Sequence, residues 1–489
     1  MLARTLPLLL ASVAAVASPA LAAPTSKPTS QPAAAKAAAK ANAKPATPAA
    51  AADSVRRYTL DQLLALARAR YPGVQAARHS LASMQQKLFR AKWAYAPQGK
   101  LQAFFAPSPT IECKDSQGRP STDFCVQTPQ VDGSSVNIGG IMAQVVLDVG
   151  LPIYTFGKIA AAKRAARAGV AVRRAQIKAS MRDIELKVTK AYWALKLARE
   201  LLYTIEQGRK HLDKGLQRIE KQLENDTGNA TVIDKLRLKT AAAEVHVREA
   251  QAKKLERLML ATLATLCRIE GRFDVDKKII DALPGKVAPV DSYLDLAKGS
   301  RPEMKLLDLA ARAQRAAVDV ERARFFPDLL LVGSVGVGTA TGVDNPKNAF
   351  YNDPFNFVRA GFGLALRWQL DTVQQVGRYR GAKADAKRVE AKRREGLAGI
   401  KLEITKARLD LVEAKARLTA AYKGQKAARS WLVAVSQNMS AGLSEPKDLN
   451  DALIGFFQLK IRYLQAMFDV NSGWAALARA IGERVRPLK

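Results

Sequence analysis

The chain has 489 residues and a formal net charge of +34, because 78 lysines and arginines outnumber 44 aspartates and glutamates. Charged residues make up 25% of the chain and aromatic residues 6%, a balance that fits long helices and argues against a compact β-sandwich. The positive charge favours a polyanionic neighbour, such as nucleic acid, an anionic membrane surface or acidic cargo, or else it solvates long exposed helices.

The first 22 residues carry the pattern of an export signal peptide. Arg4 precedes the apolar run LPLLLASVAAVA, and Ala20 and Ala22 form a small-residue cleavage site. The following segment, 23–54, is rich in alanine, proline and lysine, so we expect a disordered arm. Beyond the signal, no apolar run reaches the length of about 18 residues that a transmembrane helix needs.

The rest of the chain is an internal duplication, with repeats at 55–285 and 286–489. Pro72 and Pro97 in the first repeat align without a gap with Pro302 and Pro327 in the second. In each repeat, the first proline is expected to open a helix with periodic apolar residues, and the second proline to end it. Strand-like sequence follows directly in both repeats.

A pair of strands is predicted in each repeat, at 100–151 and at 328–371. In VRAGFGLALRWQL, the residues from Phe362 to Leu370 alternate between large apolar side chains and glycine, alanine or polar ones. IGGIMAQVVLDVGL alternates too, with Gln144 and Asp148 opposite an apolar face. Such alternation indicates one apolar and one wet side, in a half-buried sheet or in a membrane. Strands of about ten residues on an exported chain favour the membrane.

Two helices of unusual length are predicted, from Lys158 to about Asn225 and from Gln375 to about Ser440. At 1.5 Å per residue, each would reach roughly 100 Å. The first contains an apolar seam typical of coiled coils, formed by Ile205, Leu212, Leu216, Ile219 and Leu223.

Each long helix ends in a glycine turn, at Gly228 and Gly442, and a short return helix follows. The candidate N-caps of the return helices are Asn229 or Thr231 in the first repeat and Ser444 in the second.

This order of elements resembles the outer-membrane efflux protein (TolC-like) family over about residues 58–485. The duplicated proline blocks, the segment LPIYTFGK and the two glycine turns carry the resemblance. It implies an α+β membrane protein and a homotrimer. Four strands from each chain would form a 12-stranded transmembrane β-barrel, and the long helices would form a helical barrel.

LPIYTFGK resembles the strand-to-helix junction of this family. Pro152 is expected to end the hydrogen-bond ladder of the strand, and Gly157 to permit the turn into the helix. The matching segment of the second repeat, RWQLDTVQQVGRYRG, lacks the proline and is stretched, so we expect a longer or differently bent connection there.

The resemblance implies passive conduction from the periplasm to the outside, through the outer membrane of a Gram-negative-type cell. The chain would be the channel of a tripartite efflux or type I secretion system, with a periplasmic adaptor protein and an inner-membrane pump as partners. Asp448 and Asp451 match aspartates that line the channel entrance in efflux members of the family. Three chains would then carry two stacked acidic rings, which favour cations. The alternative is one capping aspartate and one solvated one.

The three cysteines fall into two groups. Cys113 and Cys125 bracket the loop of the first strand pair, and in an exported protein they are expected to form a disulfide, although two free thiols are the alternative. Cys267 is expected to be a buried, small apolar residue.

No catalytic, metal-binding or cofactor motif is recognisable. None of the three histidines belongs to an HExxH motif, and no CxxC motif lies near them. No P-loop, nucleophile elbow or dinucleotide fingerprint occurs in the sequence either. We therefore expect neither an enzyme nor a cofactor. The resemblance implies outer-membrane lipid as a neighbour and no nucleic-acid partner. Two rival interpretations are a periplasmic membrane-fusion adaptor and a basic coiled-coil envelope structural protein, and the duplicated strand pairs argue against both.

Overall fold

A computed structural model shows the chain at residues 56–121, 126–129, 131–132, 135–225, 231–276, 279–346, 353–440 and 443–483. The predicted signal peptide and arm, both turn glycines (Gly228 and Gly442) and Cys125 lie outside these residues. All elements described below belong to the unit Val55–Lys489.

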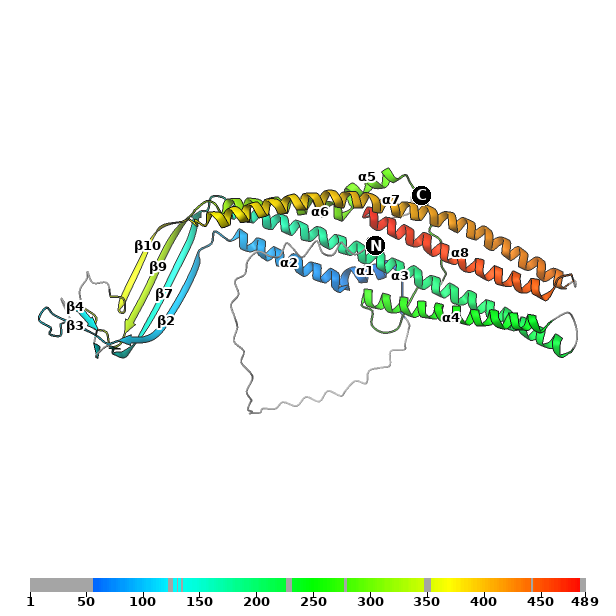
Figure 1. Ribbon diagram of the computed structural model, residues 1–489, viewed down its shortest axis with the longest axis horizontal. Coiled ribbons are helices and arrows are strands. Elements are labelled where there is room, and N and C mark those ends of the chain that lie inside the picture. The colour runs from blue at the N-terminus through cyan, green and yellow to red at the C-terminus, as the bar shows by residue number, and fades with distance from the viewer. Residues whose placement is uncertain are drawn as a thin grey trace, which may run out of the picture. The chain divides into compact units, whose positions relative to one another are not determined.

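The same order of elements occurs twice (Figure 1). The first half contains α1 (Leu60–Arg70), α2 (Pro72–Lys92), β2 (Gln98–Pro109), β7 (Ile138–Tyr154), α3 (Lys158–Glu224) and α4 (Val232–Cys267). The second half contains α5 (Val290–Ser300), α6 (Pro302–Ala323), β9 (Asp328–Ala340), β10 (Phe357–Arg367), α7 (Thr372–Ser440) and α8 (Pro446–Ile481). Shorter strands are β1 (Arg56–Tyr58), β3 (Ile111–Lys114), β4 (Val126–Pro129), β5 (Val131–Asp132), β6 (Ser135–Val136) and β8 (Phe273–Val275).

The helices follow the proline pattern of the sequence. Pro72 and Pro302 occupy the first turns of α2 and α6, where the missing N–H group costs nothing. The long helices α3 and α7 span 67 and 69 residues. The return helices α4 and α8 have 36 residues each, so the prediction of short return helices was wrong. Among the described helices, none combines the length and the apolar character needed to cross a bilayer.

Apolar side chains join each long helix to its return helix. The predicted seam on α3 is confirmed, because Leu212 and Ile219 are buried against Leu238 of α4. In the second half, Ile404 and Leu411 of α7 lie in one buried cluster with residues of α8. Each pair therefore forms an antiparallel hairpin.

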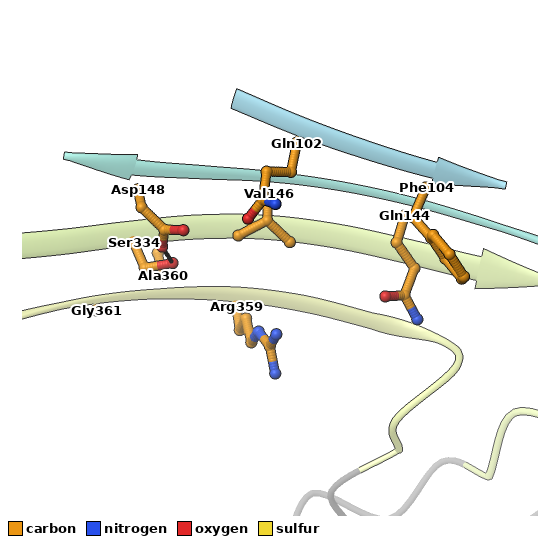
Figure 2. A pocket seen from close by; sticks show the side chains of 9 residues that line it. All are labelled: Gln102, Phe104, Gln144, Val146, Asp148, Ser334, Arg359, Ala360 and Gly361. Atoms are coloured by element: carbon orange, nitrogen blue, oxygen red, sulfur yellow. Dashed lines mark hydrogen bonds between the residues drawn. The ribbon is translucent and has the colours of Figure 1, made fainter. Parts of the chain in front are cut away.

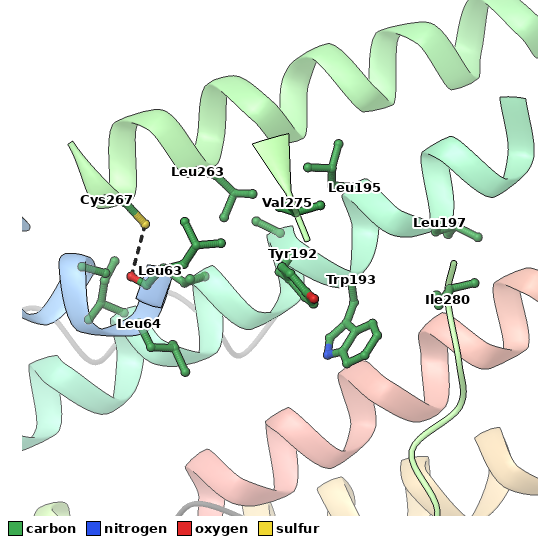
Figure 3. Packing of buried hydrophobic residues seen from close by; sticks show 14 of the residues in the cluster. Leu63, Leu64, Tyr192, Trp193, Leu195, Leu197, Leu263, Cys267, Val275 and Ile280 are labelled. Carbon is green, nitrogen blue, oxygen red and sulfur yellow. Dashed lines mark hydrogen bonds between the residues drawn. The ribbon is translucent and has the colours of Figure 1, made fainter. Parts of the chain in front are cut away.

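A second core lies where α1, α3, α4 and β8 meet, and Figure 3 shows it from close by. Leu63 of α1 and Leu263 of α4 are fully buried there. Cys267 is a free thiol in the same core, as expected for a small apolar residue, and its Sγ lies 3.4 Å from the carbonyl oxygen of Leu63. Burial raises the pKa of this thiol to about 11.

The two halves are tied together by charged side chains at the end of α8. Arg301, between α5 and α6, is 2% exposed and donates to the carbonyl oxygen of Ala480 at 2.5 Å and to Glu403. Arg479 donates to Glu403 and, at 2.9 Å, to Asp183 of α3. Leaving either arginine without its carboxylates would strand a desolvated charge, so this network holds α3, α7 and α8 in register.

The strands form an antiparallel sheet of four in the order β10-β9-β7-β2. Gln98, at the start of β2, faces Gly150 near the end of β7, and Asp328, at the start of β9, faces Arg367 at the end of β10. All four connections to helices therefore lie at one end of the sheet (Figure 1). The sheet is open, because β2 and β10 have no strand partner on their outer edges among the described residues.

The end of β10 and the start of α7 differ from their predictions. β10 ends at Arg367, so the predicted strand was too long at its C-terminal end. α7 starts at Thr372, three residues earlier than expected, and the backbone N–H of Gln375 donates to the carbonyl oxygen of Asp371 at 3.0 Å. The connection 368–371 is longer than 155–157 in the first repeat, as expected, but only by one residue.

Asn471 gives a test of how the linker before α5 is held. This fully buried side chain accepts from the N–H of Leu283 and donates to the carbonyl oxygen of Asp281, both at 2.8 Å. Asn471→Ala leaves both backbone groups unpaired, which costs about 1–3 kcal/mol. We expect a lower thermal midpoint by circular dichroism in detergent. Asn438→Ala, at an exposed position of α7, should leave the midpoint unchanged. Equal midpoints for the two variants would contradict the role of Asn471.

Candidate functional site

The strand register sorts the sheet into two chemically different faces. Leu101, Leu147 and Val335 follow one another across β2, β7 and β9 on one face. In the next row, which points to the opposite side, Gln102 and Val146 lead to Gly336 and Arg359. The alternation predicted from the sequence therefore holds across strands from both halves of the chain.

The first face is apolar and uncovered, and we call it the apolar face. Its exposed members include Leu101 (68%), Leu147 (41%), Val335 (51%), Phe362 (89%) and Leu364 (69%). Monomeric soluble proteins rarely leave so continuous an apolar surface in water.

The opposite face, which we call the polar face, is hollowed. A hollow of about 600 Å³ is lined by Gln102, Phe104, Gln144, Val146, Asp148, Ser334, Arg359, Ala360 and Gly361 (Figure 2). A second hollow on this face includes Lys100 and Arg367. Inside the first hollow, the Ser334 hydroxyl donates to Asp148 Oδ1 at 2.7 Å. The concave side of the sheet is therefore the polar one.

Exposed aromatic side chains gather where the sheet meets the helices. They come from all four connections: Trp93, Tyr95, Tyr154, Phe156, Phe326 and Trp368. The rings of Phe156 and Phe326 are stacked with centroids 6.2 Å apart, and the Trp368 indole donates to the carbonyl oxygen of Phe325 at 3.1 Å. Sequence reasoning missed this group, because its members are scattered singly along the chain. Aromatic belts of this kind border the apolar band of membrane barrels.

Pro152 does not end the ladder of β7 as predicted. The pairing of β7 with β2 ends at Gly150, whereas its pairing with β9 continues through Pro152 to Tyr154 with an irregularity between the two. Proline lacks an N–H, so it fits at a bulge where that donor is not needed. The strand therefore runs slightly past the proline before it turns.

Gly157 is the N-cap of α3 and has a φ of 87°, in the left-handed region that favours glycine. Phe156 before it has a φ of 46°, which is strained for a bulky side chain. The first residue of the helix, Lys158, forms an ion pair of 2.8 Å with Asp328 at the start of β9. This pair links the two repeats at the junction, so Lys158 has a partner within the chain.

Asp448 and Asp451 lie in the first turns of α8, and both are exposed. Asp448 Oδ2 accepts a hydrogen bond of 3.3 Å from the backbone N–H of Glu445, which is the N-cap of the helix. Ser444 was predicted as the cap and is one residue too early. In the first repeat, Asp234 forms the equivalent bond with the predicted cap Thr231 at 3.1 Å. Asp448 therefore has a capping role, and Asp451 lies exposed three residues further along the helix.

The structure describes only one of the two cysteines of the predicted disulfide. Cys113 is 1% exposed and is not among the free cysteines. Cys125 lies outside the described residues, so the pair stays a prediction. Within the described ranges, no cluster of three or more histidine, cysteine, aspartate or glutamate residues could hold a metal ion.

Known proteins resemble this chain in sequence and in fold. Residues 293–483 match the sequence model of the family described as outer membrane efflux protein. The chain is 24% identical over 312 residues to the alkaline protease secretion protein AprF of Pseudomonas aeruginosa, and the match covers 62% of each chain. The chain therefore spans under two thirds of the length of this curated relative.

Solved structures share the fold over most of their length. The outer membrane protein VceC of Vibrio cholerae superposes with a TM-score of 0.67 at 18% identity, covering 87% of this chain and 96% of VceC. The CmeC outer membrane channel of Campylobacter jejuni gives a TM-score of 0.68 at 13% identity, covering 87% of each chain. These findings confirm the resemblance to TolC-like outer-membrane efflux proteins.

Gly157 gives a test of the junction. An alanine at Gly157 must hold a φ of 87°, which costs about 1–2 kcal/mol for a residue with a Cβ. We expect Gly157→Ala to lower the thermal midpoint of the detergent-purified protein. Gly150→Ala is the matched control, since a Cβ there meets nothing within 4 Å and its φ is not positive. A midpoint no lower for Gly157→Ala than for Gly150→Ala would show that the turn carries no strain.

Proposed function

We propose that the chain is the outer-membrane channel of a tripartite efflux or type I secretion system, which passively conducts cargo from the periplasm to the outside. One observation carries this proposal: an open sheet of four strands has an exposed apolar face on one side and a concave polar face on the other. Lipid on the first side and water on the second would satisfy both faces.

The apolar face explains why the sheet would enter a membrane. Moving one large apolar side chain from water into an apolar phase is worth about 1.5–3 kcal/mol. Phe362 and Leu364 on β10 and Leu101 on β2 are each more than two-thirds exposed. The aromatic group at the helix end of the sheet would then lie at the periplasmic interface of the bilayer, with the helices below it.

The open edges explain why one copy would not suffice. In lipid, each unpaired backbone N–H or C=O costs several kcal/mol as an order of magnitude. β2 and β10 carry such groups along their outer edges, and spanning barrels start at about eight strands. A homotrimer would join β10 of one copy to β2 of the next and close a barrel of 12 strands.

Energy for transport would come from partners, a periplasmic adaptor and an inner-membrane pump. This agrees with the absence of a recognisable nucleotide-binding motif from the sequence. The name of AprF refers to protease secretion and those of VceC and CmeC to the outer membrane. The rival interpretations, an adaptor or a basic envelope coiled coil, give no reason for an amphipathic four-stranded sheet.

Two neighbouring residues of β7 test which face meets lipid. Leu147 lies on the apolar face and Val146 lines the hollow of the polar face. Leu147→Arg places a charge in lipid at a cost of about 2–4 kcal/mol, so we expect little heat-modifiable oligomer in the outer-membrane fraction. Val146→Arg carries the same change one residue away and should assemble normally. Equal assembly of the two variants, or failure of Val146→Arg alone, would contradict the assignment of the faces.

The entrance is tested by conductance. We propose that Asp448 and Asp451 of three chains form two acidic rings at the periplasmic end of the channel. Asp448→Asn with Asp451→Asn keeps the side-chain shapes and removes up to six charges per trimer. We expect a lower potassium-to-chloride permeability ratio in planar bilayers. Asp234→Asn, at the equivalent capping position of α4, is the control, and an unchanged ratio in the double variant would remove the ring assignment.

A further inference from the structure

We propose that Arg359, seated on Phe357 at the polar face, forms an anion-binding station inside the channel for carboxylate or phosphate groups. The proposal rests on the function proposed above, because it requires the polar face to line the lumen. It concerns the sheet and not the acidic entrance, and it assigns a ligand chemistry to the hollow shown in Figure 2.

The position of Arg359 is built by its neighbours. Its guanidinium carbon lies 4.3 Å from the centroid of the Phe357 ring. That ring in turn occupies space that two glycines of β9 leave open. A Cβ on Gly338 would lie 2.6 Å from a ring carbon, and a Cβ on Gly336 would lie 3.2 Å from another. The glycines therefore leave room for the ring, and the guanidinium of Arg359 lies over that ring.

The charge of Arg359 is not neutralised by the sheet around it. Among the described residues it has no carboxylate within ion-pair distance, and its row across the strands contains Gln102, Val146 and Gly336. Among the described residues that line the hollow, the one carboxylate is Asp148, which faces Lys100 across the strands and accepts the Ser334 hydroxyl at 2.7 Å.

The other cation of β10 on this face, Arg367, sits opposite Asp328, and that carboxylate forms its ion pair with Lys158 at 2.8 Å. The polar face therefore carries an excess of positive charge. A concave protein surface of low dielectric focuses the electric field of these charges on ions that pass along it.

The chemistry of the station follows from its shape. A guanidinium stacked on a ring keeps its N–H edge free, and that edge matches the two oxygens of a carboxylate or phosphate. The Gln102 amide lines the same hollow and supplies a further donor. The Gln144 amide lies there as well, but it donates to the carbonyl oxygen of Pro354 at 3.0 Å. Three copies would repeat the station around the lumen.

The test is the reversal potential of the full-length protein in planar lipid bilayers under a gradient of potassium chloride. Arg359→Gln is made in a protein that also carries Asp448→Asn and Asp451→Asn. The cation selectivity of the entrance then does not hide the effect of Arg359 on the permeability ratio. We expect the chloride-to-potassium permeability ratio to fall about twofold or more. Phe357→Leu, which removes the seat and keeps the charge, should give a smaller fall. Inorganic phosphate should reduce the single-channel current of the protein with the two aspartate substitutions alone more than that of the Arg359→Gln variant.

Arg394→Gln, an exposed arginine of α7 without an ion pair among the described residues, is the matched control and should leave the ratio unchanged. Channels that form normally, but show the same ratio and the same phosphate effect with and without Arg359, would overturn the anion station and leave the channel function intact. Failure of the unaltered protein to form any channel would instead overturn the proposed function, and the station with it.

Discussion

The outer edges of β2 and β10, which pair with no strand in the described part of the chain, are the constraint on which the rest of the structure depends. Water can form hydrogen bonds with the backbone groups of an open strand edge. The apolar face of the same sheet, however, is unfavourable in water. A sheet with both properties is stable only where lipid covers the face and other strands cover the edges. On the proposed function, membrane insertion and assembly of copies would therefore be one requirement, which a single chain would not meet.

The connections between the strands and the helices fix where the helices lie relative to the sheet. All four connections leave the same end of the sheet, so every helix lies on one side of the membrane that the sheet would enter. Gly157 makes the sharp turn possible, and the ion pair of Lys158 with Asp328 fixes the start of α3 against the other repeat. Further along, Arg301 and Arg479 tie the helices of both repeats into one body. The hollow with Arg359 and the exposed Asp451 would thus lie far apart along one path, with opposite charge.

Much of the fold could be predicted from the sequence, because long helices and amphipathic strands leave periodic patterns. The lengths of α3 and α7, the seam at Leu212 and the prolines of α2 and α6 follow from such patterns. Features that depend on several segments distant in the sequence could not be predicted in this way. The seat of Arg359 needs glycines of β9 beneath a ring from β10, and no local period shows this. Pro152 was misread because a bulge accommodates a residue without an N–H inside a strand that continues.

The number of copies in the native particle tests the central claim most directly. Native mass spectrometry of the mature protein, extracted from outer membranes in mild detergent, measures that number without any substitution. The account predicts a particle of three chains that keeps a β-sheet signal in circular dichroism and separates into single chains only when the sheet is lost. A stable particle of one chain, folded and dispersed without detergent, would contradict it.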